Sequence, residues 1–275
     1  MRLYNNPIKA LLIFLAVAAF CIWQNNHIVI TEVNYENTKI NNDLHGYKIV
    51  HISDLHNKKF GRRQRRLLEK IKKLKPNIIV VTGDLVDSRR TNIDIAMEFI
   101  NGAVEIAPVY YVSGNHEIRG KIYEELKEKL LTAGAHVMDN TKTQIEVGSS
   151  KIELIGLMDP LYRGTSYLRS NLEKLTKNES EFLRILLSHR PNFIDIYAES
   201  KVDLVFCGHA HGGQVRLPFI GGIIAPDQGL IPKYTSGVHT LEDTTMVISR
   251  GLGNSIIPIR IFNRPEIIAV TLREK

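Results

Sequence analysis

The feature that most constrains the fold of this chain is a set of five short apolar runs. Each run ends in glycine, serine or a histidine. They are apolar nearly throughout, which is typical of strands covered on both faces rather than on one; they span residues 47–53, 77–83, 108–114, 182–189 and 202–209. Between them, residues 63–75, 93–105 and 121–134 show the apolar spacing of amphipathic helices, the last ended by Gly134. The alternation predicts an α/β (α+β) domain whose sheet cores are flanked by helices.

The remaining segments fit the same single domain. Residues 143–157 read as a hairpin that turns at Gly148, and residues 244–251 and 266–273 supply late strands. The composition, 44% hydrophobic and 24% charged, is that of an ordinary globular protein. No internal repeat or interdomain linker stands out, so we expect one domain over 25–275. The two cysteines, Cys21 and Cys207, predict no disulfide framework and do not indicate a compartment.

Residues 1–24 are predicted to form an apolar membrane anchor. Arg2 and Lys9 flank an uncharged run over 10–23, which is short for a spanning helix but is extended on both sides by uncharged residues. The positive flank favours a cytoplasmic amino terminus and a catalytic domain on the outer face of the cell membrane. A signal peptide cleaved to release a secreted protein is the close alternative, although its small-residue pair, Ala16 and Ala18, lies inside the apolar run. A buried helix is the third alternative.

Polar side chains of a few types follow each of the five apolar runs. Taken singly, most of these motifs can be explained as ordinary turn residues. The strongest single indication of a metal site is the histidine pair of "GHAHGG" (208–213). Taken together, mixed imidazole and carboxylate donors suit a pair of Zn, Mn or Fe ions, which can clamp a phosphoryl group between them. Such a pair needs a carboxylate able to bridge, and Asp84 is the natural choice. The full set is Asp54, His56, Asp84, Asn115, His116, His189, His209 and His211.

The ordered motifs resemble those of the calcineurin-like metallophosphoesterases. They are "DLH" (54–56), "GDLVD" (83–87), "GNHE" (114–117), "SHRP" (188–191) and "GHAHGG" (208–213). The resemblance implies a β-sandwich flanked by helices with a dinuclear metal centre. Residues 216–230 and 250–266 further resemble the bacterial membrane-associated branch related to UDP-2,3-diacylglucosamine hydrolases.

Carried over residue by residue, the resemblance implies a role for each motif side chain. Asp54, His56, Asp84 and His211 would bind one ion; Asp84 would bridge to a second ion held by Asn115, His189 and His209. His116 would act on the phosphate without binding metal, and Asp87 would orient it. Glu117 stands where many members have aspartate and is expected to lie outside the metal shell.

Other candidates are weaker. His27, His45, His136 and His239 lie outside any motif and are expected at the surface or in loops, whereas His51 is expected to pack or support the ligands. Arg190 either touches a phosphate or is a surface residue at a helix start.

The basic run 58–66, which starts with Lys58 and ends with Arg66, follows the first ligand pair. It is interpreted as a solvated helix face or as a surface for anionic lipid, where each basic residue adds about 1 kcal/mol. A nucleic-acid role also needs stacking aromatic residues, and only Phe60 interrupts the run, so nucleic acid is an unlikely partner. The net charge of +7 favours an anionic partner in general.

These features predict a metal-dependent phosphoesterase that hydrolyses a phosphodiester or pyrophosphate by metal-activated hydroxide attack. The anchor and the branch resemblance point to a phosphorylated small-molecule or lipid-linked substrate of the cell envelope, and no protein partner is implied. A nuclease of the same superfamily and a non-catalytic metal-binding scaffold are the alternatives. The natural substrate, the metal, the preference for monoesters or diesters and the oligomeric state stay open.

Overall fold

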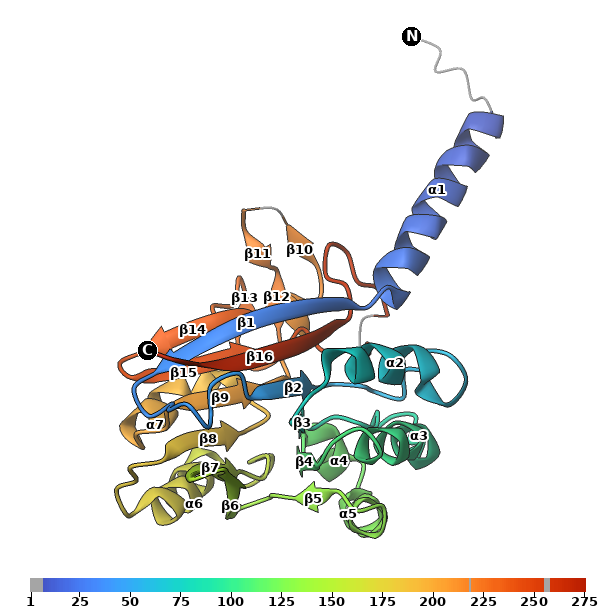
Figure 1. Cartoon of the computed structure of the whole chain (residues 1–275). Coiled ribbons are helices and arrows are strands. Elements are labelled where there is room, and N and C mark those ends of the chain that lie inside the picture. The colour runs from blue at the N-terminus through green and yellow to red at the C-terminus, as the bar shows by residue number, and fades with distance from the viewer. Residues whose placement is uncertain (1–6, 218, 255–257) are drawn as a thin grey trace.

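The computed structural model describes residues 7–217, 219–254 and 258–275, which contain two six-stranded sheets packed face to face (Figure 1). The first sheet has the order β1 (Val29–Asn37), β16 (Glu266–Glu274), β2 (Lys48–Ile52), β3 (Ile78–Thr82), β4 (Val109–Val112), β5 (His136–Val137). The second has the order β14 (Gly237–Leu241), β15 (Thr244–Ile248), β9 (Leu204–Cys207), β8 (Leu183–Leu187), β7 (Ser150–Gly156), β6 (Thr141–Val147). Both sheets mix parallel and antiparallel pairs, so the predicted fold class is confirmed.

All five predicted apolar strands are present, and their burial explains their composition. In β3, Ile78 and Val80 point into the core between the two sheets, whereas Ile79 and Val81 point into the core beneath the helices. Since successive side chains of a strand face opposite ways, both faces of β3 must be apolar. The predicted hairpin is also present, with β6 and β7 antiparallel and Val147 opposite Ser150.

Helices cover the outer face of each sheet (Figure 1). The first sheet carries α2 (Arg65–Leu74), α3 (Ile93–Val104), α4 (Asn115–Arg119) and α5 (Tyr123–Thr132), and the second carries α6 (Thr165–Thr176) and α7 (Ile194–Glu199). The predicted helical spacing places Leu67, Ile71 and Leu74 of α2 in the core. Gly134 follows α5 with a φ of 87°, the left-handed conformation expected just after a helix end. Single 3-10 turns are η1 (Arg62–Gln64), η2 (Pro191–Phe193) and η3 (His211–Gly213).

The amino-terminal apolar segment forms one helix, α1 (Pro7–Asn26), which projects from the sandwich (Figure 1). Its 20 residues make it long and apolar enough to cross a membrane, and most of its side chains are exposed. Residues 7–9 and 24–26, on either side of the 10–23 run, therefore lengthen the helix, as the sequence suggested. Arg2, part of the predicted positive flank, lies outside the described residues.

Candidate metal centre

The predicted ligands converge at one end of the sandwich, where the carboxyl ends of strands from both sheets meet. Asp54 and His56 follow β2, Asp84 follows β3, and Asn115 opens α4 just after β4. The remaining ligands, His189, His209 and His211, follow β8 and β9 of the second sheet. The donors thus come from two sheets that pack face to face, rather than from the edge of a single sheet.

One group of four donors matches the set implied for the first ion. Asp54, His56, Asp84 and His211 are buried and place one donor atom each within 4.8 Å of the others. Nε2 of His56 lies 3.2 Å from Nε2 of His211 and 3.5 Å from Oδ2 of Asp84. Nε2 of His211 lies 3.5 Å from Oδ1 of Asp54.

A second group shares Asp84 with the first. Asp84, His189 and His209 also place donor atoms within 4.8 Å of one another. Nε2 of His189 lies 3.2 Å from Oδ2 of Asp84, 3.1 Å from Nδ1 of His209 and 3.1 Å from Oδ1 of Asn115. Asp84 Oδ2 therefore faces both donor groups, which is the position a bridging carboxylate requires.

The charges of the cluster fit divalent cations. Burial would raise the pKa of Asp84, but the imidazoles of His189 and His56 hold it well below its usual range, so the carboxylate stays ionised. Burial would lower the pKa of His189, but Asp84 raises it to about 10, so a proton on His189 balances the carboxylate. Burial lowers the pKa of His211 to about 3, which leaves a neutral imidazole with a free lone pair. A cation among these donors would supply the balancing charge and use the converging lone pairs.

The backbone of the cluster is held in left-handed conformations. Asp54, His56, Asp84, His209 and His211 all have φ values between 44° and 66°. Each such residue costs of order 1–3 kcal/mol, and this cost is tolerated where the surrounding structure fixes the geometry. Glycines make room for it: a Cβ at Gly114 would overlap the Asp84 carboxylate, and one at Gly208 would overlap Ser53 and Asp54.

His116, in α4, is buried beside the two donor groups. Its backbone N–H donates to Oδ1 of Asp84 over 2.8 Å, and its ring centroid is 4.5 Å from that of His56. Its Nδ1 accepts a hydrogen bond from the Ser88 backbone N–H at 3.1 Å and lies 4.0 Å from Oδ2 of Asp87. The contact between Asp87 and His116 is thus longer than a hydrogen bond. Burial lowers the pKa of His116 to about 4.

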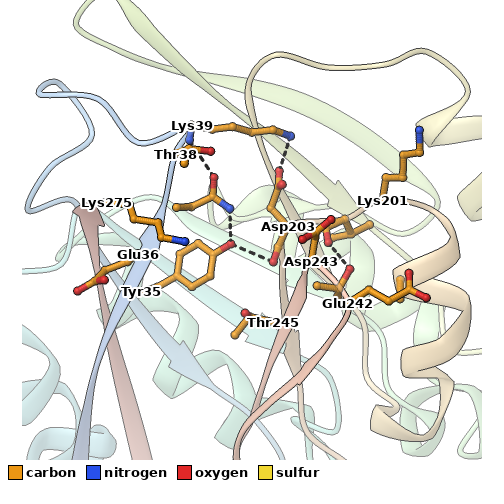
Figure 2. Close-up of a pocket in the computed structure, with 14 residues that line it drawn as sticks. Tyr35, Glu36, Thr38, Lys39, Lys201, Asp203, Glu242, Asp243, Thr245 and Lys275 are labelled. Carbon is orange, nitrogen blue, oxygen red and sulfur yellow. Dashed lines mark hydrogen bonds and ion pairs between the residues drawn. The ribbon is translucent and has the colours of Figure 1, made fainter.

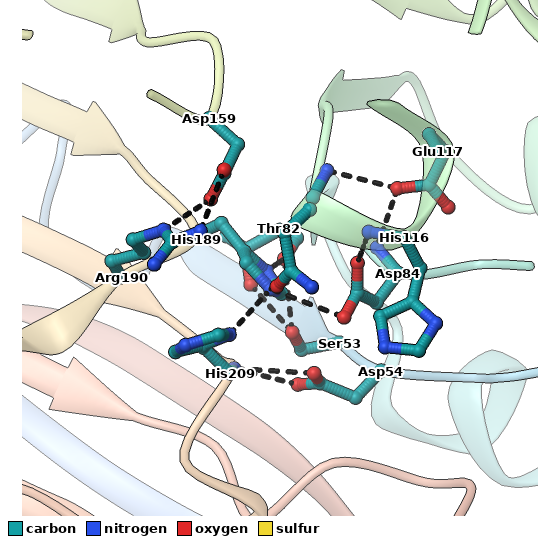
Figure 3. Close-up of polar contacts among 12 residues, drawn as sticks. Ser53, Asp54, Thr82, Asp84, His116, Glu117, Asp159, His189, Arg190 and His209 are labelled. Atoms are coloured by element: carbon teal, nitrogen blue, oxygen red, sulfur yellow. Dashed lines mark hydrogen bonds and ion pairs between the residues drawn. The ribbon is translucent and has the colours of Figure 1, made fainter. Parts of the chain in front are cut away.

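Glu117 was expected outside the metal shell, and the structure gives it a supporting role that the sequence interpretation missed. Its carboxylate is buried and accepts hydrogen bonds from the backbone N–H groups of Asp84 (3.0 Å), Val86 (3.1 Å) and Gly114 (2.9 Å) (Figure 3). It therefore ties the loop that carries Asp84 to the loop that carries Asn115. The "GNHE" motif marks the position of Glu117 in the sequence, but it does not identify the backbone groups that the carboxylate binds.

Replacing Glu117 with glutamine is expected to weaken metal binding and activity by about 10–100-fold, the usual effect of losing a residue that orients ligands. The amide oxygen accepts fewer backbone hydrogen bonds, and the amide N–H₂ group opposes one of the donors. Manganese titration followed by kcat/KM checks this. Glu128→Gln, an exposed change on α5, is the control, and equal affinities in the two variants would refute the role of Glu117.

Two further carboxylates surround Arg190. Its guanidinium donates to both oxygens of Asp159 (2.7 and 3.0 Å) and forms an ion pair with Asp227. Oδ2 of Asp227 in turn lies 2.8 Å from Nε2 of His209. Arg190 is thus buried and engaged by carboxylates, and it pairs with Asp227, which contacts the predicted ligand His209. No local sequence pattern indicates Asp159 or Asp227, since both contacts join segments that are distant along the chain.

A cavity of about 720 Å³ adjoins the cluster. His56 and Asp87 line it on the side of the donors, and Arg89 and Arg90 line it on the solvent side. A second cavity, of about 730 Å³, lies at the other end of β9 (Figure 2). There Lys39 pairs with Asp203 at 2.9 Å and Tyr35 donates to the Asp203 carbonyl, so these polar groups fasten β1 to the second sheet.

The histidines outside the motifs were expected at the surface or in loops, and three of the four are exposed. His27, His45 and His136 are exposed and His239 is half-buried. His51 is buried; its Nε2 lies 2.8 Å from Thr82 Oγ1 and its ring packs edge-on against Phe206. The Thr82 hydroxyl also bonds to Ser53, and the Thr82 carbonyl bonds to Nδ1 of His189. His51 is therefore connected through Thr82 to the predicted ligand His189.

The fold, the two overlapping donor groups and the order of the motifs define a class, the metal-dependent phosphoric ester hydrolases with a dimetal-binding site. A family model described as calcineurin-like phosphoesterase matches residues 47–213, more than half of the chain. The chain therefore belongs to the calcineurin-like phosphoesterase family.

Individual relatives agree with this assignment. The metallophosphoesterase YkuE of Bacillus subtilis (strain 168) is 31% identical over 88% of this chain and 85% of its own length. The phosphodiesterase YaeI of Escherichia coli (strain K12) is 28% identical over 82% of each chain. A zebrafish protein, named as a transmembrane protein with a metallophosphoesterase domain, is 26% identical over 98% of this chain and 63% of its own length.

Among solved structures, phosphopantetheinyl hydrolase from Mycobacterium tuberculosis has a TM-score of 0.50 at 12% identity, covering 76% of this chain and 91% of its own. This similarity shows the fold. The predicted relation to UDP-2,3-diacylglucosamine hydrolases stays a prediction, with which the similarity to YaeI is consistent.

Proposed function

We propose that this chain is a membrane-anchored enzyme that hydrolyses a phosphodiester or pyrophosphate bond in a lipid-linked or cell-envelope molecule. The single observation that carries the proposal is the sharing of Asp84 by two donor groups, with His116 beside both. When bound, two divalent cations (Mn, Zn or Fe) polarise the phosphoryl oxygens and activate the attacking water. Metal identity is part of the proposal, because several such ions accept this donor set.

The chain's own residues then divide into ligands and proton-handling groups. Asp54, His56, Asp84 and His211 would hold one ion, and Asp84 would bridge to the ion held by the other three: Asn115, His189 and His209. His116, which the chain places at the rim of the cluster, would hold or pass a proton at Nε2, because Nδ1 accepts from the Ser88 amide. Asp87 would assist by its negative charge 4.0 Å away.

The membrane part of the proposal rests on residues 1–24, which lie in or before the apolar helix α1, with residues 25–275 as the catalytic domain on the outer face. A cleaved signal would instead give a secreted enzyme. Membrane association is further supported by the basic run 58–66, in which four arginines are exposed: Arg62, Arg63, Arg65 and Arg66. Phe60 is fully buried, so it offers no stacking surface for a nucleic acid base.

Metal removal tests the proposed function. The full-length protein in detergent should hydrolyse bis(p-nitrophenyl) phosphate, lose that activity when dialysed against EDTA, and regain it when manganese is added, because the ionised carboxylates would be cation ligands. Activity that survives chelation would contradict the proposal. If protein that is shown to contain metal hydrolyses no phosphodiester, the non-catalytic metal-binding scaffold would be favoured. Salt-sensitive cleavage of DNA or RNA would favour the nuclease.

A further inference from the structure

Exposed apolar side chains outside α1 are concentrated in one region. Among the described residues outside α1, twelve large apolar side chains are exposed, and eight of them lie in two segments, 217–231 and 259–262. We call these eight the hairpin surface: Leu217, Phe219, Ile220, Ile224, Leu230, Ile231, Ile259 and Phe262. Phe219 is fully exposed, and Leu230 and Ile231 are 75% and 73% exposed. Exposed apolar side chains concentrated in this way indicate a binding surface rather than the ordinary scatter of single residues.

The hairpin surface is one connected structure. It is built from two small hairpins, β10 (Arg216–Leu217) with β11 (Gly221–Gly222) and β12 (Ile224–Ala225) with β13 (Gly229–Leu230). The Ile231 N–H donates to the Ile223 carbonyl at 2.9 Å, and the Arg216 N–H donates to the Ile261 carbonyl at 3.0 Å. These bonds hold both hairpins and the segment 259–262 together.

The same surface is continuous with α1. The ring of Phe262 packs edge-on against Phe20 of α1 with centroids 5.7 Å apart. The guanidinium of Arg264 lies 4.8 Å from the ring centroid of Trp23, near the end of α1. In Figure 1 the hairpins and α1 project from the same side of the sandwich. A tryptophan paired with an arginine at the end of an apolar helix is typical of the membrane–water interface.

The charge of the hairpin surface suits lipid. Residues 217–232 contain one charged side chain, Asp227. Asp227 is engaged by His209 and Arg190 of the metal centre. The adjacent charged residues on either side, Arg216 and Lys233, are basic and suit the negative surface of a membrane.

We propose that the hairpin surface inserts into the interfacial layer of the lipid bilayer beside α1, as a second membrane contact. Because the turn between β12 and β13 carries Asp227, one element would contact both lipid and the metal centre. The metal centre would then lie at the membrane surface rather than at the end of a loose tether. This inference does not depend on which phosphoester bond the enzyme hydrolyses.

Depth-dependent fluorescence quenching tests the insertion. Full-length protein with Cys21 replaced by serine would carry a single accessible cysteine, Phe219→Cys or Ile231→Cys, labelled with an environment-sensitive nitrobenzoxadiazole dye. Cys207 is fully buried and stays. Leu131→Cys on α5 is the matched control, because Leu131 is apolar and 53% exposed but outside the hairpin surface. The proteins would be reconstituted in vesicles of phosphatidylcholine with some phosphatidylglycerol, with and without spin-labelled lipid.

Insertion predicts a blue-shifted dye at positions 219 and 231 that spin-labelled lipid quenches several-fold more than the dye at position 131. Equal, weak quenching at all three positions would overturn the proposal. A blue shift that spin-labelled lipid does not quench, and that fades as protein is diluted in lipid, would also overturn it in favour of contact with a second copy of the chain. All three positions are exposed, so the substitutions leave the core unchanged. Failure here would leave the metal-dependent hydrolysis assay unaffected, so the two proposals fail separately.

Discussion

Asp84→Asn is expected to lower kcat/KM for bis(p-nitrophenyl) phosphate by at least about 100-fold, because losing even a ligand-supporting residue typically costs about 10–100-fold. The change removes the negative charge that faces both donor groups, 3.2 Å from His189 and 3.5 Å from His56. It also replaces an oxygen that both ions would share. Activity of the full-length protein, measured across a manganese titration, checks the prediction.

Asp243→Asn is the matched control for this substitution. Asp243 is an exposed aspartate in the turn between β14 and β15, at the opposite end of the sandwich from the donors. It should leave kcat/KM unchanged. If Asp84→Asn reached the same rate as Asp243→Asn once manganese saturates, a bridging role for Asp84 would be excluded.

His116→Ala is expected to lower kcat by about 10²–10⁴-fold, the usual contribution of a group that transfers a proton in the transition state. The metal content should stay that of the unsubstituted protein, because the His116 side chain belongs to neither ligand set. The loss should also grow when p-nitrophenol is replaced by phenol as leaving group, since the more basic oxygen needs a proton more. Rates with the two esters, together with metal analysis, check this.

His45→Ala, an exposed histidine away from the donors, is the control for His116→Ala. A loss equal for the two leaving groups would assign His116 to binding or charge stabilisation rather than to proton transfer. A variant that loses its metal would place His116 among the ligands instead.

The strands, and the side chains that converge at their ends, could be predicted from the sequence because each depends on local pattern. A strand buried on both faces must be apolar throughout, as β3 is, and its polar successor marks the strand end. The grouping of the ligands into two sets came from the resemblance to a family, and the donor distances agree with it. The division of the five strands between two sheets was not visible, since pairing is a long-range property.

The supporting residues could not be predicted for the same reason. Asp227 meets His209 only because the β12–β13 turn folds back over the end of β9, and nothing near Asp227 in the sequence indicates this. Glu117 binds backbone groups, which every sequence possesses, so no partner residue signals its role. The left-handed backbone at Asp54, Asp84 and their neighbours likewise depends on the packed structure, although aspartate and histidine adopt it more readily than most residues.

Counting the metal ions bound by each chain tests the dinuclear centre most directly. Full-length protein is stripped with chelator, reloaded with manganese, dialysed and analysed by mass spectrometry for manganese per chain. Two ions per chain are expected in the unsubstituted protein, and fewer than two in Asp84→Asn, whose shared ligand is lost. A single ion, or none, in the unsubstituted protein that nevertheless hydrolyses the diester would contradict a centre built around a shared aspartate.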